Sequence, residues 1–248
     1  MRSAPLFALL CISIISQTTL AHHKSHAYVE ETDVGFDLNL TVKGAKQLSS
    51  HSWEYGTTFQ ALLEVYNPEL SVFSKQAFPS GSLPNASSND VPALKYLAPH
   101  IDTNGDTLAN GDGANGDPAS LGVGAILLGV RNGAFEQAAT RQFHHLFEAP
   151  TLYNGAISQR EKVPELWADG MFMIPPFLAY YAVATQNKTL LRESIRQCQY
   201  YRQVLKANTT QDWDGLWVHI VGPESQTLGI WSTGERRVSF FPFLITTL

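Results

Sequence analysis

The sequence predicts a single, mainly α-helical domain, and three observations carry that prediction. Apolar residues recur at helical spacing in several long segments, whereas only one segment is typical of a strand. The 248 residues are 44% hydrophobic and 11% aromatic, which is enough to bury a sizeable core. No internal repeat and no linker divides the chain. We therefore expect an all-α fold in one domain over residues 22–248, after a leader at 1–21.

The first residues are typical of an export signal. Arg2 precedes an apolar run from 6 to 15, and Ala21 ends a short stretch suited to signal peptidase. The run is too short to span a bilayer. We expect a signal peptide that is cleaved after Ala21, and a secreted, extracellular protein.

Two further features concern secretion. Asn-x-Ser/Thr acceptor sites for N-glycosylation occur at Asn39, Asn85, Asn187 and Asn208. Cleavage of the leader leaves Cys198 as the remaining cysteine, so no internal disulfide is expected. The sequence thus predicts a glycoprotein that folds without a disulfide.

The first predicted helix covers residues 52–66, where aromatic and aliphatic residues recur at helical spacing before Asn67-Pro68. Residues 121–130 are apolar all round, which predicts a buried helix. Residues 134–147 repeat the amphipathic pattern. The polar, turn-rich stretches at 74–90 and 101–118 are expected to be loops.

The second half of the chain continues in the same way. Residues 177–184 are expected to be helical, with Pro175-Pro176 in the first turn, where proline is tolerated. Residues 189–206 predict a further amphipathic helix. The best strand candidate is 216–221. Helices joined by loops favour a fold of helical hairpins.

Charge and hydropathy exclude two classes of partner. The formal net charge is −5, and no run of Lys and Arg is present of the kind that follows a phosphate backbone. Beyond the leader, no apolar stretch is long enough for a membrane helix. We expect neither nucleic acid nor a membrane as a partner, and the sequence does not predict the oligomeric state.

The loop "DTNGDTLANGDGANGD" invites a calcium interpretation, because Asp102, Asn104 and Asp106 match the first ligands of an EF-hand. Thr107 and Gly113 replace the required Gly and Glu of that motif, and the same residue types favour tight turns. The turn-rich interpretation is favoured. No third ligand accompanies the adjacent histidines at 144 and 145, and no G-x-S-x-G motif is present. We expect no metal and no cofactor.

Asp169 stands in the otherwise apolar and aromatic stretch "ELWADGMFMIPPFLAYYA". One interpretation is a helix cap or a turn residue. The other is a carboxyl whose pKa is raised by its apolar neighbours, so that it acts as a general acid. The nearby helix end would lower the pKa, so the sequence leaves both interpretations open.

The run "GAISQREKVPELWADGMFMIPPFLAYYA" (155–182) resembles the core signature of unsaturated rhamnogalacturonyl hydrolases, in glycoside hydrolase families 105 and 88, which also hold unsaturated glucuronyl hydrolases. The signature is G-x-x-x-H-R/K followed by W-x-D-G/x-x-x-M-x-x-P-F-L. Three further pieces occur in family order, at 52–73, 116–122 and 214–234. The resemblance is to fungal members, and it covers about residues 50–234.

The resemblance implies an (α/α)6 toroid, in which helical hairpins surround a funnel that holds the site. About seven or eight helices are expected before Gly234, whereas such a ring needs about twelve. We therefore expect the toroid to be incomplete at the C-terminus, lacking its last hairpins. The final stretch "VSFFPFLITTL" fits no long helix.

The resemblance also implies a reaction. Members act on pectin-derived oligosaccharides that end in a 4,5-unsaturated uronic acid, and they hydrate the C4=C5 enol ether. Asp169 matches the residue that donates the proton and then activates the water. Ordinary glycosidases protonate the glycosidic oxygen instead. The expected partner is therefore an oligosaccharide with an unsaturated uronyl end.

Further site residues follow from the match. Asp117 matches the second essential carboxylate, with a helix N-cap as the alternative. His219 matches a histidine that contacts the uronate, and Trp231 matches the tryptophan of the family's W-A-R/T-G-N element. Trp167 and Trp217 are candidates for stacking on sugar rings, with core packing as the alternative.

One position departs from the family. The match also places Gln159 and Arg160 among the substrate-binding residues, but Gln159 stands where relatives have histidine. Glutamine can bond a sugar hydroxyl but carries no charge. Two alternatives therefore stay open, namely a catalytically inactive sugar-binding relative and a different (α/α)6 glycosidase or lyase.

Overall fold

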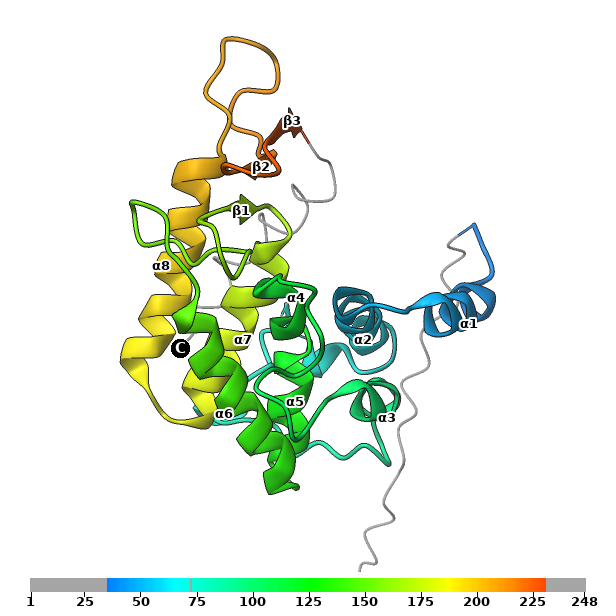
Figure 1. The fold of residues 1–248 in the computed structure, drawn as a ribbon. Coiled ribbons are helices and arrows are strands. Elements are labelled where there is room, and N and C mark those ends of the chain that lie inside the picture. Colours follow the sequence, from blue (N-terminus) through cyan, green and yellow to red (C-terminus); the bar gives the residue numbers. More distant parts are fainter. Residues whose placement is uncertain (1–34, 72, 231–248) are drawn as a thin grey trace, which may run out of the picture.

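The computed structural model describes residues 35–71 and 73–230. These residues are mostly helical and carry a small antiparallel sheet (Figure 1). The α-helices are α1 (Leu38–Leu48), α2 (Ser52–Tyr66), α3 (Pro92–Leu97), α4 (Gly116–Ala119), α5 (Gly122–Gly129), α6 (Gly133–Glu148), α7 (Gly170–Ala184) and α8 (Lys188–Leu205). The strands are β1 (Leu166–Trp167), β2 (Val218–Val221) and β3 (Thr227–Ile230). The prediction of a mainly α-helical protein is confirmed for this part of the chain.

Consecutive helices pack as hairpins. Helices α5 and α6 lie against each other, and so do α7 and α8, which run side by side in Figure 1. A short turn at 185–187 joins α7 to α8, and Gln186 adopts a left-handed conformation there with φ of 53°. Asn187 then starts α8, since its side chain accepts the Leu190 N–H at 3.0 Å. The paired helices are those that the periodicity predicted.

Four helices fall where their patterns placed them. Helix α2 has the predicted bounds, and α6 and α8 agree with 134–147 and 189–206 to within one residue at each end. Helix α5 is apolar all round and is buried from Gly122 to Leu128, as a helix without a polar face should be.

The prediction for the Pro175-Pro176 pair was wrong. Helix α7 begins at Gly170, so both prolines lie inside it rather than in its first turn. Residues 173–180 of α7 are all buried, and burial of this apolar segment outweighs the backbone bonds that the prolines cannot donate. The buried Ser194 hydroxyl of α8 also donates to the Pro175 carbonyl at 3.0 Å. Packing against α8 therefore keeps α7 helical despite its two prolines.

The sheet has the order β1-β2-β3 and is antiparallel throughout. It lies beyond the ends of α7 and α8 (Figure 1). Leu166 pairs with Val221 and Trp167 with Ile220, which brings the chain before α7 against β2. The strand predicted at 216–221 is confirmed as β2. The other two strands were missed because β1 is only two residues long and β3 is largely exposed, so neither shows a clear alternation.

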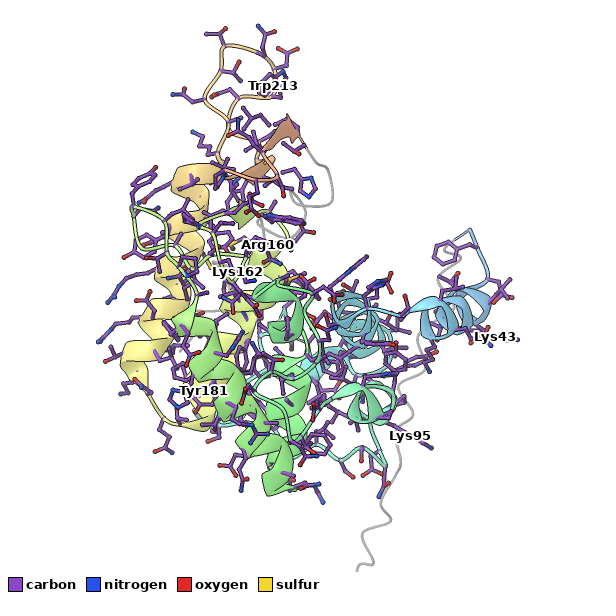
Figure 2. The ribbon with its side chains drawn as sticks, in the orientation of Figure 1. Lys43, Lys95, Arg160, Lys162, Tyr181 and Trp213 are labelled. Atoms are coloured by element: carbon purple, nitrogen blue, oxygen red, sulfur yellow. The ribbon has the colours of Figure 1, made fainter. Side chains whose placement is uncertain are left out.

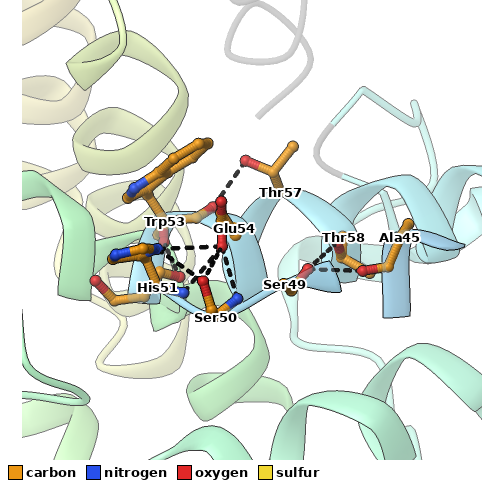
Figure 3. A network of polar contacts seen from close by, with 10 residues as sticks. Ala45, Ser49, Ser50, His51, Trp53, Glu54, Thr57 and Thr58 are labelled. Carbon is orange, nitrogen blue, oxygen red and sulfur yellow. Dashed lines mark hydrogen bonds and ion pairs between the residues drawn. The ribbon is translucent and has the colours of Figure 1, made fainter. Parts of the chain in front are cut away.

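Helix α1 was also missed. It has no buried residue and lies at the edge of the molecule, next to α2 (Figure 1). The Ser49 hydroxyl, just after α1, bonds the Thr58 hydroxyl of α2 at 2.9 Å (Figure 3). Glu54 Oε2 accepts the backbone N–H groups of Ser50 and His51, which fixes the start of α2. These bonds, the Ser50 N–H first, lower the pKa of Glu54 to about 2.

The loop at 101–118 contains the tight turns that its composition favours. Asp102 Oδ1 accepts the N–H groups of Asn104 and Gly105 at 2.8 and 3.0 Å, which is the turn geometry favoured for the loop at 101–118. The end of that stretch is helical, since α4 starts at Gly116. Within the ranges described above, no helix combines the length and the apolar character that crossing a membrane requires.

Candidate active site

Asp169 occupies the N-cap position of α7, directly after β1. Its side chain makes no bond to its own helix. Instead, Oδ2 lies 3.2 Å from Nε2 of His219 on β2. The Asp169 side chain is 20% exposed and the His219 side chain 26%, so both are accessible from solvent. Asp169 thus stands at a helix N-terminus, which favours an anion, with its carboxylate turned to a neighbouring element.

Asp117 lies in α4 and is the second carboxylate of the site. Its Oδ1 accepts a hydrogen bond of 2.8 Å from Gln159 Nε2. Partial burial, and then the negative charge of Asp169, raise the pKa of Asp117 to about 6, against the attraction of Arg160 and the bond from Gln159. Two carboxylates that are 52 residues apart in sequence therefore interact electrostatically in one site.

Arg160 supplies the positive charge of the site. Its guanidinium carbon lies 5.9 Å from the ring centroid of Trp167, a cation–π arrangement. The rings of Trp167 and His219 meet edge to face, with centroids 6.1 Å apart. Arg160 lies at the end of the helices next to the sheet (Figure 2). Cation, aromatic face and histidine are thus consecutive neighbours beside Asp169.

The loop that carries Arg160 is fixed on both sides. Asn115 N–H donates to the Gln159 carbonyl at 2.7 Å, and Gln159 N–H donates to the Glu165 carbonyl at 2.8 Å. His145 Nε2 of α6 lies 3.1 Å from Glu161 Oε1. The loop is therefore closed by its own bond between Gln159 and Glu165, and it is held to Asn115, just before α4, and to α6 through the Glu161 side chain.

Tyr201 of α8 lies beneath the start of α7. The residue is completely buried, and its hydroxyl donates to the Ile157 carbonyl at 2.8 Å. Burial first, and then the charge of Asp169, raise the pKa of the phenol far above its ordinary value. A Cβ on Gly170 would lie 2.6 Å from this hydroxyl, so glycine is required for the approach. The helical periodicity of α8 marked Tyr201 as a core residue and gave no signal of its place beside Asp169.

The structure corrects the interpretation of Gln159. We expected it to contact a sugar, but it is only 1% exposed and donates its amide N–H to Asp117. Gln159 Oε1 lies against Gly116, where a side chain at 116 would overlap it. The residue therefore acts on Asp117 from behind, and burial keeps it from direct contact with a ligand.

The predicted sugar-binding roles of Trp217 and Trp231 compare differently with the structure. Trp217 is 2% exposed and belongs to the hydrophobic core, so the core-packing alternative describes it, and its expected role in sugar stacking does not fit. Trp231 lies outside the described residues, and its predicted role stays a prediction. The four acceptor asparagines, Asn39, Asn85, Asn187 and Asn208, are all exposed.

The site brings together groups that are suited to acid–base chemistry. Among residues 35–71 and 73–230, no three His, Cys, Asp or Glu side chains are grouped so as to hold a metal ion. Asp117, Asp169 and His219 can exchange protons with a ligand, and Arg160 with Trp167 can hold an anionic ring. Such a combination suits an acidic sugar.

The comparisons with known proteins agree with this chemistry. Among curated proteins, no relative matches the chain. A family model described as Glycosyl Hydrolase Family 88 matches residues 88–233, which is more than half of the chain and includes α4, β1, α7 and β2 with Asp117, Asp169 and His219. The signature around Asp169 indicates the same family as this match, which covers most of the described structure. The chain therefore belongs to glycosyl hydrolase family 88.

Proposed function

We propose that this protein releases 4,5-unsaturated uronic acid from the ends of pectin-derived rhamnogalacturonan oligosaccharides. The observation that carries the proposal is the grouping of Asp169 with His219, 3.2 Å away, beside the Trp167 ring that lies under Arg160. Family membership supports a glycoside hydrolase that acts on unsaturated uronides. In this proposal the guanidinium of Arg160 binds the uronate carboxylate, and the exposed side of Trp167 packs against the sugar ring.

The proposed reaction adds water across the C4=C5 bond. Asp169 donates its proton to C4, and the positive charge that develops at C5 is shared with the ring oxygen. Water then attacks C5 and returns a proton to Asp169. The C5 hemiketal opens to a ketone and leaves C1 as a hemiacetal, which collapses to an aldehyde and releases the remaining oligosaccharide as an alcohol. No group other than water is consumed.

Each neighbour has a part in this scheme. Asp117 supplies a second carboxylate, whose charge interacts with that of Asp169. Gln159 stabilises ionised Asp117 through its hydrogen bond of 2.8 Å. His219, 3.2 Å from Asp169, orients that carboxyl. Because one carboxyl gives and regains the proton, the scheme needs no second carboxylate as a nucleophile.

We also propose the complete fold of the enzyme, its secretion and its glycosylation. The α5–α6 and α7–α8 hairpins are assigned as consecutive hairpins of an (α/α)6 toroid. Secretion and N-glycosylation are proposed as well, supported by exposure of the four acceptor asparagines. Analysis of the secreted, enzymatically deglycosylated protein by mass spectrometry tests both.

The reaction is tested with purified protein and lyase-treated rhamnogalacturonan. Loss of ultraviolet absorbance from the C4=C5 chromophore, with release of an oligosaccharide that is shorter by one uronyl residue, is the expected result. A parallel sample of lyase-treated glycosaminoglycan distinguishes a rhamnogalacturonyl from a glucuronyl preference. Thermal stabilisation by the oligosaccharide without loss of absorbance would instead indicate a sugar-binding relative. A rise in absorbance with intact polysaccharide would indicate a lyase and overturn the proposal.

A further inference from the structure

Glu165 is a completely buried carboxylate that the proposed chemistry does not use. It immediately precedes β1 and faces three hydrogen-bond donors. Oε1 accepts from Trp167 Nε1 at 2.6 Å. Oε2 accepts from the backbone N–H groups of Glu224 and Ser225 at 3.1 and 2.9 Å. A buried charge is costly unless it is bonded in this way, so the arrangement calls for an explanation.

The three partners require an ionised carboxylate. An indole and two backbone N–H groups can only donate, so both oxygens of residue 165 must accept. Burial acts to raise the pKa of Glu165, but the bonds from Ser225, Trp167 and Glu224 outweigh it and hold the pKa below its ordinary value. An amide of the same shape would turn an NH2 group toward a donor at one of its two ends. Glutamine therefore cannot replace glutamate here without losing a contact.

One end of this network leads to the site. The indole that Glu165 holds is the ring under the Arg160 guanidinium, 5.9 Å from centroid to guanidinium carbon. The same ring also meets the ring of His219 edge to face, and His219 pairs with Asp169. A rotation of Trp167 would therefore move its contacts with the cation that is to bind the uronate and with the histidine that orients the acid.

The other end leads to the turn between β2 and β3. Glu224 and Ser225 lie in that turn, and His219 lies on β2 just before it. Gly222 permits the close approach, because a Cβ at this position would overlap with Cβ and Cγ of Glu165. One carboxylate thus connects β1, which leads to Asp169, with the turn that follows His219.

We propose that Glu165 is a positioning residue, which fixes the Trp167 ring and the β2–β3 turn so that Arg160, His219 and Asp169 keep their mutual geometry. Its contact with Trp167 stands on the structure alone. Its effect on turnover rests on the proposed function.

The contact is tested without any substrate. The sequence contains five tryptophans, so protein labelled with 15N-tryptophan gives a small set of indole N–H signals. Trp167→Phe identifies the signal of Trp167. In Glu165→Gln that signal should shift and exchange faster with solvent, while those of the other tryptophans stay in place. Gly222→Ala should shift the same signal from the opposite end of the network. If it stays in place in both folded variants, the proposal is overturned.

The effect on the reaction is tested separately. Glu165→Gln should lower kcat/KM by about tenfold or more, as misplacement of substrate-holding groups does. When Glu165→Gln is introduced into the Trp167→Phe variant, the further loss of kcat/KM should be much smaller, because the indole donor is already absent. Glu148→Gln, an exposed charge at the end of α6, is the matched control and should leave kcat/KM unchanged. Equal losses in both backgrounds would show a merely structural role. If the wild-type protein has no activity, the proposed function fails and the indole signals still decide the contact.

Discussion

At the scale of single residues, Asp117 and Asp169 have the same side chain in different surroundings. Asp169 pairs with His219 at the N-terminus of α7, whereas Asp117 is partly buried and bonded by the Gln159 amide. Partial burial first, and then the charge of Asp169, raise the pKa of Asp117. Substitutions at each position should therefore have different consequences.

Asp169→Asn should remove turnover while leaving the fold intact. Asparagine keeps an oxygen for His219 but cannot donate a carboxylic proton, and general acid–base catalysis is worth about 100-fold or more. The rate of chromophore loss measures the effect, and the thermal midpoint serves as the control for folding. Activity within tenfold of wild type would exclude Asp169 as the proton donor.

Asp117→Asn should stabilise the protein at neutral pH. The folded pKa of about 6 lies above the ordinary value of 3.8, so the folded state binds more protons between these values. Stability is therefore lost as pH rises through this window, and above pH 6 the whole penalty is present. Asparagine removes a penalty on the order of 2 kcal/mol, after allowance for partial exposure.

Urea unfolding at two pH values tests this prediction. The gain in the free energy of unfolding should be present at about pH 7.5 and should shrink toward about pH 4, where the folded carboxyl keeps its proton. Equal gains at both values would mean that the stabilisation does not come from the charge of Asp117.

Gln159→Met should move the acidic limb of the pH–rate profile upward. Methionine has a similar length and lacks the N–H group that stabilises ionised Asp117, so the pKa of Asp117 should rise further above about 6. The profile of kcat/KM measures the shift. In the Asp117→Asn background, Gln159→Met should leave the limb in place, and a shift there would refute the link between the two residues.

At the scale of elements, the start of α7 is set by its contact with α8. Gly170 lies against the buried Tyr201 ring and hydroxyl, and Asp169 is its immediate neighbour. A side chain at position 170 must push α7 away from α8 or displace Tyr201, which would move Asp169 relative to His219. Packing between these two helices therefore determines both stability and site geometry.

Gly170→Ala should lower stability and kcat together, with a loss of about 1–3 kcal/mol in the free energy of unfolding from overpacking. The matched control is Gly124→Ala in α5, where the added Cβ would overlap with the Leu97 side chain in the core. The control should lower stability and leave kcat unchanged under folded conditions. Thermal unfolding and turnover measured on both variants test the distinction, and an unaffected kcat in Gly170→Ala would contradict it.

At the scale of the whole molecule, burial is unevenly distributed. Helices α5 and α7 are buried along most of their length, whereas α1 has no buried residue and lies beside α2 at the edge (Figure 1). Local opening is easiest where few apolar contacts must be broken. The hairpins α5–α6 and α7–α8 should therefore form the most stable unit of the described structure.

Hydrogen exchange followed by mass spectrometry tests this gradient. Amides of α1 should exchange fastest among the helices, and those of α5 and α7 should exchange slowest, close to the rate of global unfolding. Protection of α1 equal to that of α5 would show that α1 has a stabilising contact beyond α2.

Local patterns in the sequence determined the helices at 52–66, 121–130, 134–147 and 189–206. They also singled out Asp169, because it is a carboxylate among apolar and aromatic neighbours in the sequence. Helical periodicity is carried by residues three and four apart, so it is visible without a fold. Resemblance to a family then indicated Asp117, Arg160, Trp167 and His219, and these side chains lie together in the structure.

Tertiary structure alone decided the rest. Gln159 turns away from solvent to hold Asp117, 42 residues distant, and His219 meets Asp169 across 50 residues. Trp217 enters the core, the Pro175-Pro176 pair lies inside a helix, and Glu165 finds its donors in a turn 59 and 60 residues later. Such contacts depend on which surfaces the packed helices bring together. No local pattern encodes them, because the energy of burial and of buried hydrogen bonds exists only once the chain has folded.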